Sequence, residues 1–318
     1  MNRGDRVVVT GGAGFIGSVL VDQLVTLGLR VTVLDDFNDY YSPDLKRANL
    51  ANALKTGLVD VVEGDICIPA DVRKALEIGE PQAVIHLAAR AGVRPSIASP
   101  ELYYQVNCMG TVNLFKTCLQ HGLKRIIFAS SSSVYGEAEQ VPFHEEMKVD
   151  RPVSPYAASK QAGEALAHSF AAVEQMDIAC LRFFTVYGPR QRPEMAIHHF
   201  MSAVKEGREI TLFGDGSTSR DYTYVGDIVR GIVLALDKAK GFRIYNVGSG
   251  APIQLLPLVE LIGETLGKTP RITLAPMQKG DVSRTYADVS RATEELGFVP
   301  EVTLREGLIR MANWMDSN

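Results

Sequence analysis

The sequence lacks the patterns that mark metal-binding, redox and nucleic-acid-binding proteins. Its four cysteines are far apart and match no CxxC spacing, which predicts buried, reduced thiols and no metal site. The net charge is only −4 at pH 7, and no long block of one sign occurs. The charge therefore gives no reason to expect nucleic acid or a membrane surface as a partner.

Long hydrophobic runs are absent as well. None approaches the length that a membrane-spanning helix needs. The chain also passes from Met1 through a few polar residues directly into the apolar run 7–9, which leaves no room for a signal sequence. We therefore expect a cytoplasmic protein with no membrane partner.

What the sequence does contain is a regular alternation of short β-branched runs and longer helical patterns. Because such alternation is typical of βαβ units, it predicts an α/β fold with a Rossmann-type, doubly wound parallel sheet. The helices at 101–121 and 155–173 are long and apolar on more than one face, so they could pair in a bundle. Strands are predicted at 6–10, 30–34, 59–63, 83–86, 125–129 and 178–182, and helices at 15–27, 69–76, 101–121, 155–173 and 303–314.

The length of 318 residues predicts two lobes with a cleft between them, because one hydrophobic core seldom organises so long a chain. We expect a first domain over 1–186 and a smaller C-terminal, substrate-binding lobe that takes up most of 187–318. Some later segments could return to the first domain. Short apolar elements at 210–213, 244–247 and 272–274 are assigned to the second lobe.

Three glycines, Gly11, Gly14 and Gly17, lie directly after a predicted strand and at the start of a predicted helix. Glycine permits a tight turn, lets backbone amides approach a pyrophosphate, and lets strand and helix pack closely. Asp35 ends the second strand, where a carboxylate can accept hydrogen bonds from ribose hydroxyls and would repel a 2′-phosphate. The combination predicts that residues 1–186 bind NAD rather than NADP, whereas the glycines alone would also suit a plain βα turn.

Four further residues are candidates for the adenosine end of this site. Asp36 and Asn38 lie beside Asp35 in the chain, and Asp65 and Ile66 follow the third strand, where they could flank the adenine. Ordinary loop chemistry explains these four residues nearly as well.

A second pattern, Tyr156 followed by Lys160, opens a predicted helix after the serine-rich end of the fifth strand. Residues four apart share one helix face, so the lysine ammonium can lie near the phenol. That charge, with the positive charge of an oxidised nicotinamide, favours the phenolate and allows the tyrosine to act as a base near neutral pH. Taken alone, the same spacing usually marks a solvated helix face.

These motifs together resemble the extended short-chain dehydrogenase/reductase family, namely its nucleotide-sugar epimerases and dehydratases, over nearly the whole chain. The resemblance implies that Ser131 bridges substrate and phenolate, that Tyr156 is the acid/base and that Lys160 binds the cofactor ribose. It also implies a homodimer joined by a four-helix bundle. The residues implied to line the cofactor include Phe15, Ile16, Leu87, Ala88, Ala89, Asn107, Ser130 and Phe183. The matching stretches are 11–17, 86–89, 106–107, 130–136, 156–160, 181–189 and 220–225.

The residues after Ser131 bear on the reaction. Members of this family that remove water from the sugar, and the decarboxylases of xylose synthesis, carry a glutamate at the position of Ser133, and the 3,5-epimerase/reductases carry a cysteine. The dehydratases usually have a further acid at the position of Ser132. Without a second acid or base, the resemblance implies that the hydride taken from C4 is returned there, which is 4-epimerisation. A net dehydrogenase and a non-catalytic NAD-binding regulator remain alternatives.

Resemblance also guides the choice of substrate. Arg220, Arg192 and Arg284 are candidates to hold the diphosphate of a UDP-sugar, because a guanidinium suits two-point contact with phosphate. The stretch from Gln278 to Asp281 resembles the region that closes over uridine.

For the sugar itself, Thr185 stands where galactose-type epimerases usually carry asparagine, and the run 185–196 is similar to UDP-glucuronate 4-epimerases. Hydroxyls of Ser132, Ser133 and Thr185 could hold a C6 carboxylate, with charge from Arg192. The expected pair is UDP-glucuronate and UDP-galacturonate. The alternative is UDP-glucose and UDP-galactose or their N-acetyl derivatives.

Overall fold

The computed structural model describes residues 1–277 and 280–317. Its centre is a seven-stranded sheet in the order β11-β6-β5-β4-β1-β2-β3, in which every neighbouring pair is parallel. The predicted Rossmann-type sheet is therefore confirmed. The strands are β1 (Arg6–Thr10), β2 (Arg30–Asp35), β3 (Val59–Glu63), β4 (Pro81–His86), β5 (Arg125–Ser131), β6 (Asp177–Phe183) and β11 (Phe242–Val247).

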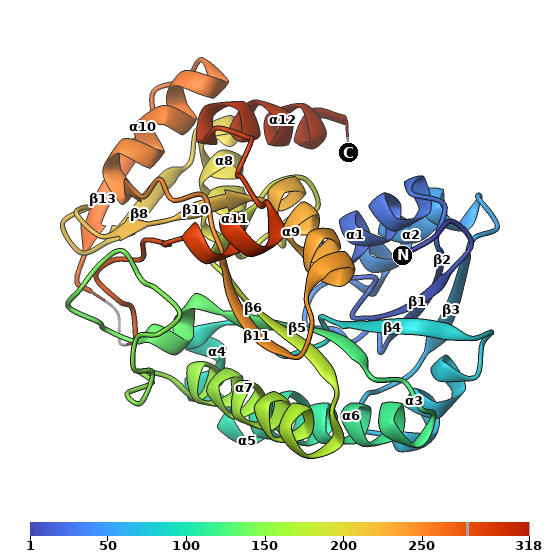
Figure 1. Ribbon diagram of the computed structural model, residues 1–318. Coiled ribbons are helices and arrows are strands. Elements are labelled where there is room, and N and C mark those ends of the chain that lie inside the picture. The colour runs from blue at the N-terminus through green and yellow to red at the C-terminus, as the bar shows by residue number, and fades with distance from the viewer. Residues whose placement is uncertain (278–279, 318) are drawn as a thin grey trace.

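Helices cover both faces of this sheet (Figure 1). In β1, Val7 and Val9 pack into the apolar cluster of one face and Val8 into that of the other, as the alternation of side chains along a strand requires. The first face carries α1 (Phe15–Thr26), α2 (Pro43–Leu54), α9 (Val225–Lys238) and α11 (Ser290–Leu296). The second carries α3 (Pro69–Leu76), α6 (Thr111–Gln120) and α7 (Pro155–Glu174).

Helix α7 begins where the sequence predicts a helix. Pro155 takes the first helical position, and the Ser154 hydroxyl accepts a hydrogen bond from the Ala157 amide at 3.1 Å. A serine cap followed by proline is a strong start signal, because it satisfies one of the otherwise free amides of the first turn. Tyr156 and Lys160 are fixed in the first two turns of this helix.

The helix predicted at 101–121 forms, but its middle part is π-helical. After α4 (Val93–Ala98), the chain runs as one continuous helix through α5 (Pro100–Tyr103), the π-helical segment η1 (Tyr104–Gly110) and α6. Within η1 the Asn107 side chain bonds to both backbone polar groups of Arg90, at 2.8 and 2.9 Å. A π-helical turn with such a tertiary contact is a departure that helical periodicity does not reveal.

The second lobe has its own apolar cluster, beside the carboxyl edge of the sheet. The segment 244–247, which we expected in this lobe, instead belongs to β11 and pairs with β6 in the main sheet. The elements of the lobe are α8 (Ala196–Glu206), α10 (Leu255–Leu266) and α12 (Leu304–Ser317), with three strand pairs: β7 (Thr185–Tyr187) with β10 (Tyr222–Tyr224), β9 (Ser219–Arg220) with β12 (Ile253–Gln254), and β8 (Glu209–Phe213) with β13 (Arg271–Ala275).

The buried carboxylate of Asp221 joins this lobe to the sheet. It accepts hydrogen bonds from the amides of Ser249, Gly250 and Ala287 at 2.8 to 3.1 Å. The carbonyl of Asp221 accepts from the Thr185 amide at 3.0 Å. Because buried carboxylates need such partners, this hub fixes the stretch that carries Thr185 against the end of β6.

Among the described residues, no helix is long and apolar enough to cross a membrane. No group of three or more His, Cys, Asp or Glu among them could hold a metal ion.

All four cysteines are free thiols. Cys118 and Cys180 are buried as expected, whereas Cys67 and Cys108 are only partly buried.

Candidate active site

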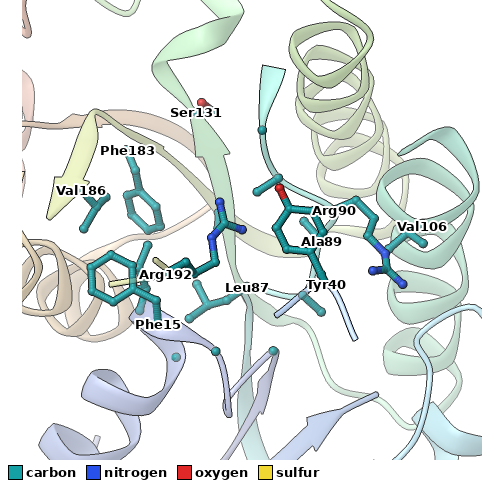
Figure 2. A pocket seen from close by; sticks show the side chains of 18 of the residues that line it. Phe15, Tyr40, Leu87, Ala89, Arg90, Val106, Ser131, Phe183, Val186 and Arg192 are labelled. Atoms are coloured by element: carbon teal, nitrogen blue, oxygen red, sulfur yellow. The ribbon is translucent and has the colours of Figure 1, made fainter. Parts of the chain in front are cut away.

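One cleft opens at the carboxyl ends of the parallel strands, where the strand order reverses between β1 and β4. This is the position at which open α/β sheets bind their ligands. Figure 2 shows Phe15, Leu87, Ser131 and Phe183 around this cleft. Most of the predicted site residues line it together: Gly11, Gly14, Phe15, Ile16, Gly17, Asp35, Asp36, Asn38, Asp65, Ile66, Leu87, Ala88, Ala89, Ser130, Ser131, Ser132, Ser133, Tyr156, Lys160, Phe183, Thr185 and Arg192.

The glycine turn forms the floor at one end. Gly11 has φ of +69°, and a Cβ there would lie 2.7 Å from the Ala88 amide nitrogen, so only glycine fits. The first turn of α1 has no side-chain cap at Gly14, which leaves its amides available to a ligand. The space, the free amides and the helix dipole suit the pyrophosphate of a dinucleotide.

Asp35 lies beside this turn at the end of β2. Its two carboxylate oxygens accept hydrogen bonds from the amides of Ala13 and Phe37, each at 3.0 Å. Burial raises the pKa of Asp35, and these two hydrogen bonds oppose that effect. Each oxygen keeps a further lone pair, so the carboxylate could also accept from ribose hydroxyls.

The other adenosine-end candidates bond locally. Asn38 donates from Nδ2 to Asp36 Oδ1 at 2.5 Å, and Asp65 Oδ1 accepts from the Cys67 amide at 2.8 Å.

Sequence reasoning missed a wall of the cleft formed by Tyr40, Tyr41, Lys46 and Arg90. The Tyr41 hydroxyl is buried and has no hydrogen-bond partner, and it lies 4.0 Å from where a Cβ of Gly14 would be. Lys46 Nζ lies 4.9 Å from the centre of the Tyr41 ring and donates to the Asn38 carbonyl at 2.7 Å. No motif identifies these residues, because the segment after β2 brings Tyr40, Tyr41 and Lys46 to the cleft, and the loop after β4 brings Arg90 there.

The predicted catalytic residues meet at the other end of the cleft. Burial raises the pKa of Tyr156, and hydrogen bonding to the Ser131 side chain and the charge of Arg192 lower it. Ser131 Oγ donates to Ser133 Oγ at 3.1 Å. Lys160 Nζ donates to the Ala129 carbonyl at 2.6 Å, and burial lowers the pKa of Lys160 to about 8. The phenol of Tyr156 therefore lies one helical turn from the side chain of Lys160, whose ammonium loses its proton near pH 8.

Arg192 brings positive charge to this end of the cleft. Its guanidinium lies 5.1 Å from the centre of the Tyr40 ring, and Figure 2 shows the two side chains beside each other. Its Nε lies 2.9 Å from Glu194 Oε1. Because Arg192 acts on the pKa of Tyr156, its charge reaches the catalytic residues.

Some predicted residues do not line the cleft. Asn107 lies behind it and binds the backbone of Arg90, next to Ala89. Arg220 donates to the carbonyl of Ser219, the preceding residue of β9, and to that of Ser283. Asp281 pairs with Arg94 at 2.9 Å, Arg284 donates to the carbonyl of Glu139, and Gln278 lies outside the described residues.

The chain is similar to known proteins over most of its length. The profile of the "NAD dependent epimerase/dehydratase family" matches residues 7–248. A UDP-glucuronate 4-epimerase of Thermodesulfobacterium geofontis is 39% identical over 98% of this chain and 96% of its own length.

Two solved structures are similar as well. The UDP-glucuronic acid 4-epimerase from Bacillus cereus, in complex with UDP-glucuronic acid and NAD, has a TM-score of 0.93 at 34% identity and covers 98% of this chain and 99% of its own. The UDP-glucose 4-epimerase from Thermotoga maritima, with UDP-glucose, has a TM-score of 0.91 at 32% identity and the same coverages.

We predict that Tyr41→Phe weakens NAD binding roughly fivefold, since a lost neutral hydrogen bond costs about 1 kcal/mol. The ligand-free variant should be at least as stable as the unmodified protein, because an unpartnered buried hydroxyl is removed. Calorimetric titration of NAD and thermal unfolding measure the two effects. Tyr104→Phe, which changes an exposed tyrosine, is the matched control. Unchanged NAD affinity in Tyr41→Phe would show that the hydroxyl does not contact the cofactor.

Proposed function

Because the chain belongs to the NAD dependent epimerase/dehydratase family, we propose that it interconverts UDP-glucuronate and UDP-galacturonate by inverting C4 of the sugar. The observation that carries the proposal is one cleft in which Ser131, Tyr156 and Lys160 adjoin Thr185 and Arg192. The UDP-glucuronate 4-epimerases similar to this chain over nearly their whole length support the same substrate.

NAD, when bound, accepts the hydride from C4 of the sugar and gives it back. The glycine turn and the amides of α1 would hold its pyrophosphate, and Asp35 its adenosine ribose. Lys160 would hold the ribose of the nicotinamide half. The apolar side chains of Phe15, Leu87 and Phe183 would exclude water from the same space.

Tyr156 moves the proton. Its hydroxyl would take the proton of the C4 hydroxyl, directly or through Ser131, and return it to the C4 oxygen once the keto sugar has turned over. Burial alone would leave the phenol too weak an acid. Ser131 and the charge of Arg192 lower the pKa of Tyr156, and the Lys160 ammonium one helical turn away would further stabilise the phenolate. Below a pH of about 8 Lys160 keeps its proton and supplies that charge.

The residues after Ser131 restrict the outcome to epimerisation. Ser132 and Ser133 carry no group that can act as a base without help, and Ser133 Oγ already accepts from Ser131. Eliminating water across C5 and C6, or removing the C5 proton, would require a carboxylate or thiol there. The keto sugar is therefore reduced again at C4, with no net redox change.

The same residues favour a uronic acid as substrate. Hydroxyls of Ser131, Ser132, Ser133 and Thr185 could hold a C6 carboxylate, and Arg192 would neutralise its charge. Such restraint matters because a 4-keto uronic acid is a β-keto acid, which loses carbon dioxide when its carboxylate turns perpendicular to the carbonyl. A plain UDP-hexose would need no such wall.

We also propose that two copies of the chain form a homodimer. The contact surface on each copy would be formed by α7 and the helical segment 100–120. Leu102, Tyr104 and Met109 expose apolar surface along α5 and η1, which a partner helix pair could cover. The cytoplasmic location stays a prediction from the sequence.

We predict that the purified protein converts UDP-glucuronate into UDP-galacturonate without added reductant and without accumulating NADH. Chromatography of the UDP-sugars and absorbance at the NADH band measure both outcomes. Tyr156→Phe should abolish turnover while the protein still binds NAD. Turnover of UDP-glucose with none of the uronate would refute the proposed substrate, and stoichiometric NADH would refute epimerisation.

Arg192→Met should raise KM for UDP-glucuronate roughly thirtyfold, because a hydrogen-bonded charge contact is worth about 2 kcal/mol. The KM for UDP-glucose should change much less, since that substrate carries no carboxylate, whereas kcat should fall on both substrates because the charge that lowers the pKa of Tyr156 is lost. Steady-state kinetics on both substrates test this split. An equal rise in KM for the two would assign Arg192 to the diphosphate or to the fold instead.

A further inference from the structure

A second layer of charge lies directly beneath Tyr156 and Lys160. Glu164 follows Lys160 by one turn of α7, and Arg182 approaches from β6. The exposed fractions are 4% for Lys160, 5% for Glu164 and 1% for Arg182. Ionised groups this deeply buried need partners, so their arrangement constrains the catalytic helix.

Glu164 is held from two strands. Arg182 donates from Nε to Oε1 at 2.9 Å and from Nη2 to Oε2 at 2.7 Å, and Ser130 Oγ donates to Oε1 at 2.5 Å. The Arg182 guanidinium also lies 4.8 Å from the centre of the Tyr135 ring. A bidentate, buried contact of this kind fixes both the position and the negative charge of Glu164.

Lys160 has no such direct partner. Its ammonium donates to the Ala129 carbonyl and lies 5.1 Å from the centre of the Phe128 ring, and no ion pair within 4 Å joins it to a carboxylate of the described residues. Ala129 directly precedes Ser130, so Glu164 holds the strand end whose carbonyl receives Lys160.

The other titratable groups around Lys160 are uncharged near neutral pH. His86 on β4 is buried, and its pKa is lowered to about 3. Burial raises the pKa of the Cys108 thiol from η1 and of the Cys180 thiol from β6. Glu164 thus supplies the negative charge that acts on Lys160 through the protein interior, and it opposes the effect of burial on the pKa of Lys160.

We propose that Glu164 is a positioning residue, the shared counter-ion of Arg182 and Lys160, and that it keeps Lys160 in the ammonium form. The inference rests on the proposed function, because there the ammonium of Lys160 stabilises the Tyr156 phenolate during turnover. The sign follows from charge: a carboxylate stabilises the ammonium, so neutralising Glu164 makes Lys160 lose its proton at lower pH.

The test is Glu164→Gln in the NAD-bound protein. NMR of isotope-labelled lysines, with Lys160 assigned through Lys160→Met, follows the titration directly and needs no substrate. We expect Lys160 to titrate about one pH unit lower in the variant. The alkaline limb of kcat/KM for the epimerisation should move by the same amount, a loss of roughly fivefold at pH 8. An unchanged titration of Lys160 would overturn the proposal.

Asp227→Asn is the matched control. Asp227 is 3% exposed on α9, pairs with Arg230 at 2.8 Å and accepts from the Val302 amide at 3.1 Å. Both substitutions should lower the unfolding temperature, but only Glu164→Gln should move the pH profile. An equal shift in Asp227→Asn would also overturn the proposal.

A second variant tests the proposal if Glu164→Gln does not fold. Where Glu164→Gln alone does not fold, the double variant with Arg182→Met removes both buried charges and should still shift the titration of Lys160 downward. A protein that turns over no UDP-sugar would refute the proposed function, and the titration of Lys160 would still decide the role of Glu164.

Discussion

The parallel alignment of the strands is the constraint on which the rest of the structure depends. Because every strand of the main sheet runs the same way, the residues that follow β1, β2, β4 and β5 meet at one edge. The reversal of strand order between β1 and β4 leaves space there, and the close approach of Gly11 to Ala88 fixes the two strand ends against each other. The cofactor end and the catalytic end of the cleft both follow from this geometry, and the Asp221 hub adds Thr185 from the second lobe.

In the cleft, burial shifts the pKa of each catalytic residue in one direction, and a few fixed partners shift it in the other. Burial raises the pKa of Tyr156 and lowers the pKa of Lys160, and both changes oppose the phenolate–ammonium pair that proton transfer requires. Ser131, Arg192 and Glu164 act in the other direction. Ser131 is hydrogen-bonded to Ser133 within the cleft, whereas Glu164 is held by Arg182 beneath it. The chemistry therefore depends in part on Glu164 and Arg182, which do not line the cleft.

The sequence predicts the parts of this site that local spacing determines. Gly11, Gly14 and Gly17 follow a strand, and Tyr156 and Lys160 share a helix face, so these positions could be assigned before the structure was known. Tyr41 could not, because the path of the loop after β2 brings it to the cleft. The role of Glu164 could not either, because its partner Arg182 comes from another element, β6. The same reason explains why Asn107 lies behind the wall, and why the predicted helix at 101–121 contains a π-helical segment. Arg220 bonds to backbone of its own lobe, which no pattern of charge indicates.

The central claim is that oxidation at C4 is transient and is reversed within the same cleft. The measurement that tests it most directly uses UDP-glucuronate labelled with deuterium at C4, incubated with the protein in ordinary water. If the hydrogen removed from C4 is the hydrogen returned, UDP-galacturonate retains the deuterium at C4. Replacement of deuterium by solvent hydrogen at C4, seen by NMR or mass spectrometry of the product, would contradict the account.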